Sequence, residues 1–585
     1  MCAIFGVINL NPKKINLAHQ SLNLLKHRGP DDAGYLYSKN NSIYFGHRRL
    51  SIIDLSSEAS QPMTSSDGKI WLTYNGEIYN YKFIKIELEN EGFKFKTKSD
   101  TEVIIAAYEI WGIEKTLVKL NGIFAFAISD FKKNKVYLVR DQVGVKPLYY
   151  CLKNNSAGYQ TLSFASEIKA LKKYENELDI DNTALYDFLT YRYIPSPKTM
   201  YKEVKQLQPG EYLSYSFKSK DIPILKKYWD LNFYEIKETY NESLDNLHQK
   251  IEKAIHSQYL ASDVPVSFFL SGGIDSACIL SSASKLNNQS LNAFTVKFLD
   301  SHRDESVEAN RLSSFLNVEH NIIEASVDSS NTFTIDQLSE WFDQPFSDTS
   351  SWPMNLLCEA VSKKTKVAIS GDGADELFSG YKWYRKNQKI KLPYSQNFCK
   401  YIRILTKLTG IKKFHNLANR LEPYVKKNKF EEYIFSLGTS LPRSWRQLWK
   451  KTLEISNDYD EYWAFRPHWK EDIPEPLRYQ IIDFKTFLPD DILTKVDRVS
   501  MANSLEVRVP FLDINVIDLA FNTSLKFGNK TINKKILIDI YKETVPNKYF
   551  DKPKAGFSLP EKLWDKKLIN SLHPTLGVLS NFIKI

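Results

Sequence analysis

The sequence is poor in cysteine, and the few cysteines it has are scattered. Its 585 residues include five cysteines, no two of which lie at C-x-x-C spacing. This usage excludes a disulfide framework and argues against a structural zinc site. It fits a reducing, cytoplasmic compartment. The five are Cys2, Cys151, Cys278, Cys358 and Cys399.

Long apolar runs are also missing. No stretch reaches the length of about eighteen apolar residues that a membrane-spanning helix needs, so no membrane partner is expected. The opening residues MCAIFGVINL carry no basic residue, and their apolar stretch is too short for a signal peptide. The chain is nevertheless 43% hydrophobic and contains 34 Phe, 33 Tyr and 11 Trp. Such a composition excludes disorder and predicts a multidomain protein, most simply an enzyme, with well-packed cores.

The net charge of +10 is concentrated in one segment. Residues 385–429 contain 13 Lys or Arg and one acid, Glu422, which leaves 66 basic and 68 acidic residues elsewhere. A solvated basic helical face explains such a run, and RNA binding is the alternative. Because the segment lacks the interleaved aromatic and Gly-rich pattern of RNA-binding modules, we expect no nucleic-acid partner.

Two different patterns divide the chain. Up to about residue 150, short strands bounded by Gly, Asn and Asp alternate with helical stretches such as 80–91 and 101–111, which predicts a layered α+β fold. From about residue 230, the apolar strand PVSFFL precedes SGGIDS and a helix, and the strands NAFTVKF and KVAIS follow. Strand, Gly-rich turn and helix in succession predict a parallel α/β sheet. We place the domains at 2–215 and 241–585, with a linker at 216–240.

Cys2 follows the initiator Met directly. Removal of that Met would give the cysteine a free α-amine, which can act as a base for its own thiol. A buried small apolar residue is the alternative interpretation. Four motifs accompany this cysteine: HRGPDD (27–32), HRRLSIID (47–54), NGEIYN (75–80) and SDTE (99–102).

Together with MCAIFG, these motifs resemble the glutamine amidotransferase domain of the class B, glutamine-hydrolysing asparagine synthetases. The resemblance implies an αββα N-terminal-nucleophile fold in which Cys2 attacks the side-chain amide of glutamine. It also implies an oxyanion site made by Asn75 and Gly76. Arg49 would bind the α-carboxylate of glutamine, while Asp100 and Glu77 face its α-ammonium. The alternatives are a surface ion pair between Arg49 and Asp100, and a simple hairpin turn at Asn75-Gly76.

The loop Ser271-Gly272-Gly273-Ile274-Asp275-Ser276 is suited to an anion, because glycines allow close backbone approach and helix N-termini present free N–H groups. It is not a Walker loop, since G-x-x-x-x-G-K-[ST] is missing. The pattern resembles the pyrophosphate loop of ATP pyrophosphatases, which implies that the second domain is an α/β parallel-sheet ATP-pyrophosphatase domain with a helical C-terminal part.

That resemblance implies ATP and Mg²⁺ as cofactors. Asp275 and Asp375 would hold the metal. Asp372 and Lys554 would act around the activated carboxyl group, although Asp372 stands where the best-known members carry Glu. Charged residues in 490–513 are expected to form structural ion pairs near the site. The remaining implied ATP contacts are Ser271, Gly272, Gly273, Ser276, Val296, Ser370 and Gly371, and the expected ion-pair residues are Lys495, Asp497, Arg498, Glu506 and Arg508.

The resemblance implies that glutamine supplies ammonia for the ATP-dependent amidation of a carboxylate, with ammonia passing between the domains inside the protein. We expect aspartate as the acceptor. The region 341–352, WFDQPFSDTSSW, differs from the E-T-Y-D-V-T-T-I-R of aspartate-using members, so a uronic acid of a surface polysaccharide is the alternative. The expected partners are therefore small molecules, and the resemblance implies a homodimer.

Overall fold

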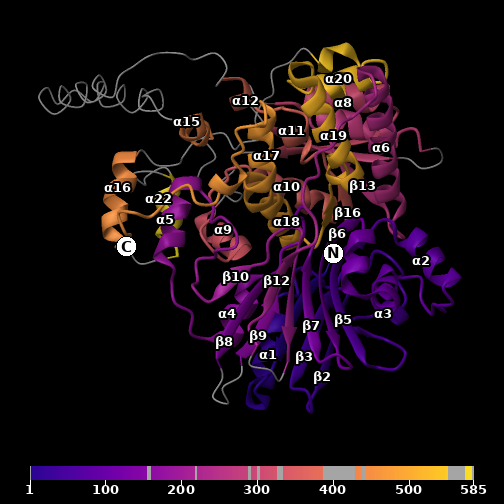
Figure 1. Ribbon diagram of the computed structural model, residues 1–585. Helices are drawn as coiled ribbons and strands as arrows, with labels where there is room; N and C mark the ends of the chain where they lie inside the picture. Colours follow the sequence, from indigo (N-terminus) through magenta and orange to yellow (C-terminus); the bar gives the residue numbers. More distant parts are fainter. Residues whose placement is uncertain are drawn as a thin grey trace, which may run out of the picture.

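The computed structural model describes residues 2–154, 160–217, 221–286, 291–298, 304–325, 334–386, 429–437, 443–550 and 574–582. In Figure 1 the N-terminal strands fill the lower half and the later helices the upper half, and the chain begins between them. Most of the basic segment, and Lys554 with it, lies outside the described residues. Within the described part of the chain, no helix combines the length and apolar character needed to cross a bilayer.

Two antiparallel sheets form the first part of the chain. In the first sheet the order is β10 (Val204–Gln206), β8 (Tyr149–Asn154), β9 (Gln160–Ala165), β1 (Ala3–Ile8), β3 (Ile43–Arg49) and β2 (Asp32–Ser38). In the second sheet the order is β12 (Ile224–Lys227), β11 (Glu211–Ser216), β7 (Lys135–Arg140), β6 (Gly122–Asp130), β5 (Ile70–Ile78) and β4 (Met63–Thr64).

The two sheets pack face to face through apolar side chains such as Ile4 and Phe45 of the first and Ala127 and Leu138 of the second. Helices cover the outer faces, so central strands such as β1 are buried on both sides. This arrangement confirms the predicted layered α+β fold. The flanking helices are α1 (Ile15–Asn23), α2 (Tyr81–Asn90), α3 (Asp100–Lys119), α4 (Ile168–Glu175) and α5 (Asn182–Tyr191).

The predicted helices at 80–91 and 101–111 correspond to α2 and α3. Helix α3 begins at Asp100 because the Ser99 hydroxyl accepts a hydrogen bond from the backbone N–H of Thr101 and caps the first turn. It continues to Lys119 across a break at Gly112, where φ is 74°. The sequence pattern therefore located this helix but not its full length.

A parallel sheet organises the second part of the chain, as the strand–turn–helix pattern predicted. Its strand order is β15 (Glu319–Ala325), β14 (Asn292–Phe298), β13 (Val266–Phe269), β16 (Val367–Ile369) and β17 (Glu506–Arg508). Loops that follow β13 and β16 meet at the carboxyl edge of this sheet, where ligands of open α/β folds bind.

Helices surround this sheet and make up most of the C-terminal third (Figure 1). A π-helical turn, Leu488–Ile492, leads directly into α18. The helices are α6 (Tyr240–Leu260), α7 (Ile274–Ala283), α8 (Ser306–Phe315), α9 (Ile335–Phe342), α10 (Ser351–Ser362), α11 (Ala374–Leu377), α12 (Trp383–Lys386), α15 (Lys429–Ser436), α16 (Arg443–Thr452), α17 (Leu477–Lys485), α18 (Leu493–Ala502), α19 (Ile514–Phe527), α20 (Lys535–Tyr541) and α22 (Pro574–Leu579).

Candidate active sites

Cys2 immediately precedes strand β1 and is buried. Only 8% of the residue is exposed. Its backbone N–H donates to Asn75 Oδ1 at 2.9 Å, and its thiol lies 3.9 Å from the carbonyl oxygen of Leu50. Burial raises the pKa of the Cys2 thiol to about 11. The thiol is therefore protonated at neutral pH, and it needs a base before it can act as a nucleophile.

Asn75 and Gly76 lie inside strand β5, opposite β6, so the alternative of a hairpin turn is wrong. The Oδ1 atom of Asn75 accepts the hydrogen bond from Cys2, and its Nδ2 is buried with no hydrogen-bond partner among the described residues. Gly76 has φ 151°, and a Cβ there would stand 2.1 Å from the carbonyl oxygen of Ile123. An unpaired amide donor beside a thiol fits an oxyanion site.

Arg49 and Asp100 are both buried, with 6% and 4% exposed, and they form no pair with each other, so the alternative of a surface ion pair is wrong. The Arg49 guanidinium donates to the carbonyl oxygens of Ser56, at 3.0 Å, and of Asp54. No carboxylate within the described ranges forms an ion pair with it. Its positive charge is therefore left for an anionic group.

The two acids predicted to face an ammonium group differ in their surroundings. Asp100 Oδ2 accepts hydrogen bonds from the Tyr74 hydroxyl at 2.8 Å and from the N–H of Ile78 at 3.0 Å, and burial raises the pKa of Asp100 to about 6. Glu77 Oε2 is buried and has no hydrogen-bond partner in the described chain. Burial raises the pKa of Glu77 well above its usual value. Of these two acids, Glu77 thus has a carboxylate oxygen, Oε2, that is available to bind a ligand.

The SGGIDS loop connects β13 to α7, as predicted. The Ser271 hydroxyl accepts a hydrogen bond from the N–H of Gly273 at 3.1 Å and lies 3.0 Å from the Ser276 hydroxyl. The N–H of Gly272 donates to Glu305 Oε2 at 3.0 Å. A carboxylate oxygen therefore already sits on this loop, which agrees with the preference of such loops for anions.

Asp275 and Asp375, the predicted metal ligands, come together around one cation. Lys534 Nζ lies 2.5 Å from Asp275 Oδ2 and 2.6 Å from Asp375 Oδ1. A Cβ at Gly371 would lie 2.9 Å from the Cβ of Asp275, so glycine permits the two loops to approach. The described residues contain no group of three metal-ligating side chains. Two carboxylates fit Mg²⁺, which usually takes one or two carboxylates together with phosphate oxygens and water.

The remaining predicted residues occupy the same edge of the sheet. The Ser370 hydroxyl donates to Asp372 Oδ2 at 2.7 Å, in the loop between β16 and α11. Val296 is buried on strand β14 of the same sheet. The roles of these residues stay predictions, as does that of Lys554.

Arg508 contacts both candidate sites. Its backbone oxygen accepts a hydrogen bond from the N–H of Ser370 at 2.9 Å, while its Nη2 lies 3.6 Å from Glu77 Oε1. Its Nε donates to Glu506 Oε1 at 2.6 Å. The Arg508 side chain therefore adjoins Glu77 of the Cys2 site, and its backbone adjoins the loop that carries Ser370 and Asp372. The predicted passage of ammonia would run through this region.

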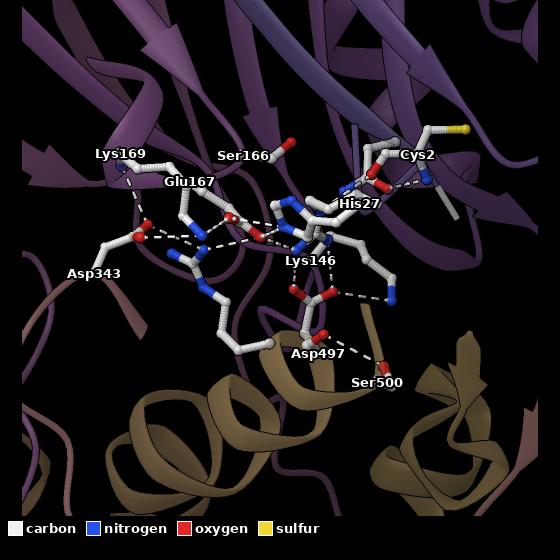
Figure 2. A network of polar contacts seen from close by, with 12 residues as sticks. Cys2, His27, Lys146, Ser166, Glu167, Lys169, Asp343, Asp497 and Ser500 are labelled. Carbon is white, nitrogen blue, oxygen red and sulfur yellow. Dashed lines mark hydrogen bonds and ion pairs between the residues drawn. The ribbon is translucent and has the colours of Figure 1, made fainter. Parts of the chain in front are cut away.

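A second buried contact links Cys2 to helix α18. Arg28, fully buried, donates from Nε to the carbonyl oxygen of Cys2 at 3.2 Å and from both Nη atoms to Asp497 at 2.8 and 3.0 Å. Lys146 Nζ lies 3.6 Å from Asp497. Figure 2 shows Asp497 on the helix below, reaching up toward Lys146. Burial opposes the ionisation of Asp497, but the Arg28 guanidinium lowers its pKa. Asp497 therefore stays ionised.

Glu167 extends this network toward the segment 341–352. Arg28 and Arg498 reach Glu167 Oε1 at 2.9 and 3.1 Å, and Arg498 also lies 3.4 Å from Asp343 Oδ2. Lys169 joins Glu167 and Asp343, and Figure 2 shows it above the latter. The five charged residues expected from 490–513 do form ion pairs, and three of them (Asp497, Arg498 and Arg508) contact the first part of the chain.

Breaking this buried network should destabilise the protein strongly. We expect Asp497→Asn to lower the free energy of unfolding by about 3–5 kcal/mol, because two buried cations, Arg28 and Lys146, would face a neutral amide in place of the carboxylate that they share. Thermal or denaturant unfolding measures this. The matched control is Asp31→Asn, which removes the exposed ion pair with Lys366 (2.7 Å) and should cost less than about 1 kcal/mol. Equal losses in both variants would contradict the expectation.

Sequence reasoning missed Arg28 as an interface residue, and it missed Lys534 and Glu305. Arg28 stands within the motif HRGPDD, so the motif offered a signal. Lys534 and Glu305 belong to stretches without a distinguishing pattern. Their positions beside Asp275 and Gly272 become visible only after folding.

Comparisons with known proteins agree with this arrangement. The family described as the glutamine amidotransferase domain matches residues 1–229, and the asparagine synthase family matches residues 246–577. The glutamine-hydrolyzing asparagine synthetase 1 of Bacillus subtilis is 32% identical over 97% of this chain and 89% of its own length. A putative glutamine-hydrolyzing asparagine synthetase of Mycobacterium tuberculosis is 30% identical over 95% and 86%. Amidase chry2 of Gibberella zeae is 29% identical over 93% and 85%.

Both parts of the chain, and almost its whole length, are thus covered by matches of the same kind. The thiol site falls within the amidotransferase match, and the SGGIDS loop falls within the synthase match. The chain belongs to the family of glutamine-hydrolysing asparagine synthetases.

Proposed function

We propose that this protein is an ATP-dependent carbon–nitrogen ligase that makes asparagine from aspartate, with glutamine as the nitrogen donor. The overall reaction converts glutamine, aspartate, ATP and water into glutamate, asparagine, AMP and pyrophosphate. The observation that carries the proposal is the position of Arg508, which contacts Glu77 with its guanidinium and the Ser370 loop with its backbone. One residue thereby joins a site suited to releasing ammonia to a site suited to using it.

In the first half-reaction, the α-amine of Cys2, free once Met1 is removed, would take the thiol proton as the sulfur attacks the side-chain amide of glutamine, and would pass that proton to the departing ammonia. The buried Nδ2 of Asn75 supports this proposal, because an unpaired donor is available for the developing oxyanion. Ammonia leaves, and water hydrolyses the thioester to glutamate. Arg49 would hold the α-carboxylate of glutamine, and Glu77 with Asp100 would hold its α-ammonium.

In the second half-reaction, the aspartate side-chain carboxylate attacks the α-phosphorus of ATP and pyrophosphate leaves. The loop N–H groups at Gly272 and Gly273 and the hydroxyls of Ser271 and Ser276 would bind the pyrophosphate. Asp275 and Asp375 would hold Mg²⁺, which supplies charge neutralisation to the phosphate oxygens when bound. Lys534 lies against both carboxylates and would add a positive charge there.

Ammonia then attacks the activated carboxyl carbon and AMP leaves. Asp372, held by the Ser370 hydroxyl, would take up the proton of the incoming ammonia, and Lys554 would stabilise the charge on the reacting centre.

The described cysteines, Cys2, Cys151, Cys278 and Cys358, are all free and buried, which supports a reducing, cytoplasmic location. The homodimer that the family resemblance implies is also part of the proposal.

An acceptor screen tests the proposal. AMP release is measured with Mg·ATP and glutamine while the acceptor is L-aspartate, D-glucuronate or D-galacturonate. We expect aspartate to give turnover and the uronates to give less than about 1% of its kcat/KM, since a site that pairs polar groups rejects an analogue lacking them. Turnover with a uronate and not with aspartate would replace the proposed acceptor with the polysaccharide alternative.

A further inference from the structure

Five polar side chains, three of them buried, gather near the loop that carries Asp372. Three segments that are far apart in the sequence supply them: the end of α5 with Arg192, the residues Asp348 and Ser350 before α10, and the π-helical turn and α18 with Asp491 and Lys495. We call these five residues the acceptor pocket. Single π-helical turns are rare and are found mostly at functional sites.

The cationic part of this pocket is held firmly. Lys495 Nζ lies 2.8 Å from Asp348 Oδ2 and donates to the Ser350 hydroxyl at 2.7 Å. Asp348 is itself fixed, because its Oδ1 accepts hydrogen bonds from the N–H and the hydroxyl of Ser350, both at 2.8 Å. Asp372 lies close enough to Lys495 to raise its pKa. The acceptor pocket therefore lies near the loop after β16 that carries Asp372.

Two consecutive buried aspartates of the π-helical turn differ in the hydrogen bonds that they accept. Asp490 Oδ2 accepts hydrogen bonds from the N–H of Ser196 at 2.9 Å and from its hydroxyl at 3.2 Å. The Oδ1 atoms of Asp490 and Asp491 are both buried without a hydrogen-bond partner in the described chain, but Asp491, with 4% exposed, accepts no hydrogen bond there with its other oxygen either. Burial and the neighbouring Asp348 raise the pKa of Asp491 to about 7. A buried carboxylate without a partner is costly to the fold, so its retention points to a ligand.

Arg192 completes the pocket from the first part of the chain. It ends α5 in the left-handed conformation, with φ 72°, and its carbonyl oxygen accepts a hydrogen bond from the N–H of Ser347 at 2.9 Å. The Arg192 Nε is buried and has no partner among the described residues. The Arg192 backbone thus ends the helix, while its buried Nε is a second unpaired polar atom in the acceptor pocket.

We propose that Asp491 is a specificity-determining residue that binds the α-ammonium group of the acceptor, so that the pocket selects an α-amino acid over a carboxylic acid without an amino group. Lys495, which has one N–H left over, and Arg192 would bind the carboxylates. The inference rests on the proposed function, which names aspartate. A uronate would bring hydroxyl groups to Asp491 but no cation, so the buried Asp491 carboxylate would be left without a compensating charge.

The test uses the full-length protein with Mg·ATP and ammonium chloride as the nitrogen source, so that the Cys2 site does not limit the reaction. AMP release is measured with L-aspartate and with succinate, which has the same two carboxylates but no amino group. We expect the wild type to prefer aspartate by about 10³-fold or more in kcat/KM. In Asp491→Asn, the kcat/KM for aspartate should fall about 10²-fold while that for succinate changes less than about threefold.

Asp490→Asn is the matched control, because it makes the same change one residue away at a carboxylate with a structural partner. It should keep the wild-type preference for aspartate over succinate. A second variant, Asp491→Glu, keeps the charge but moves it by one methylene, and it should raise the KM for aspartate at least about fivefold. Glutamine hydrolysis and thermal unfolding show whether each variant is folded.

The outcomes separate the inference from the proposed function. If the wild type uses aspartate, and Asp491→Asn and Asp491→Glu keep its KM for aspartate and its preference over succinate, the role of Asp491 is wrong while the function stands. The role of Asp491 is also wrong if Asp490→Asn collapses the preference as fully as Asp491→Asn. If the wild type does not use aspartate at all, the proposed function itself fails.

Discussion

Replacing Cys2 by alanine is expected to abolish glutamine-dependent synthesis and to leave ammonia-dependent synthesis intact. Loss of a catalytic nucleophile typically costs a factor of about 10⁴–10⁶ in rate. The hydrogen bond from Cys2 to Asn75 Oδ1 involves the backbone N–H and not the thiol, so it survives the substitution. The loss would therefore report the missing sulfur and not a displaced oxyanion site.

The measurement compares glutamate release and AMP release with glutamine or ammonium chloride as the nitrogen source. Cys2→Ala should release no glutamate above background, and its AMP release with ammonium should stay within about twofold of the wild type. Cys151→Ala is the control, because Cys151 is another free, buried cysteine of the same domain, on strand β8. Glutamine-driven AMP release by Cys2→Ala at the wild-type rate would show that the nucleophile is another residue.

The site residues that the sequence singled out belong to short, local patterns. Cys2, Asn75 and the SGGIDS loop each stand at the start, inside or at the end of a strand, so one stretch of sequence specifies both the element and the residue it presents. The fold class followed for the same reason, since alternating strands predict antiparallel layers and strand–turn–helix units predict a parallel sheet. Both were confirmed.

What the sequence could not supply are contacts between distant segments. Arg28 and Asp497 are 469 positions apart, and no local pattern pairs them. Lys534 looks like any surface lysine until folding places it between Asp275 and Asp375. Asp490 and Asp491 are the same residue type in the sequence, and only the structure separates the carboxylate that accepts hydrogen bonds from Ser196 from the one that accepts none in the described chain.

Replacing Asp275 by alanine is expected to stop the release of AMP and pyrophosphate with either nitrogen source. If Asp275 is one of two carboxylates that hold Mg²⁺, its removal forfeits several kcal/mol of charge stabilisation, equivalent to a rate loss of about 10³-fold. The fold should survive, because Lys534 Nζ keeps its contact with Asp375 Oδ1 at 2.6 Å and therefore does not become an unpaired buried charge. Glutamine hydrolysis at Cys2, measured as glutamate release, should continue.

Asp275→Ala would thus lose AMP release and keep glutamine hydrolysis, whereas Cys2→Ala would lose glutamine hydrolysis and keep ammonia-dependent AMP release. Together the two variants assign each half-reaction to its own site. Asp336→Ala is the control, since Asp336 occupies the first turn of α9 as Asp275 occupies the first turn of α7, away from the predicted metal site. It should release AMP at close to the wild-type rate. Wild-type AMP release by Asp275→Ala would exclude this carboxylate as a metal ligand, and loss of glutamate release in the same variant would show that the substitution damages the fold and not only the ATP-type site.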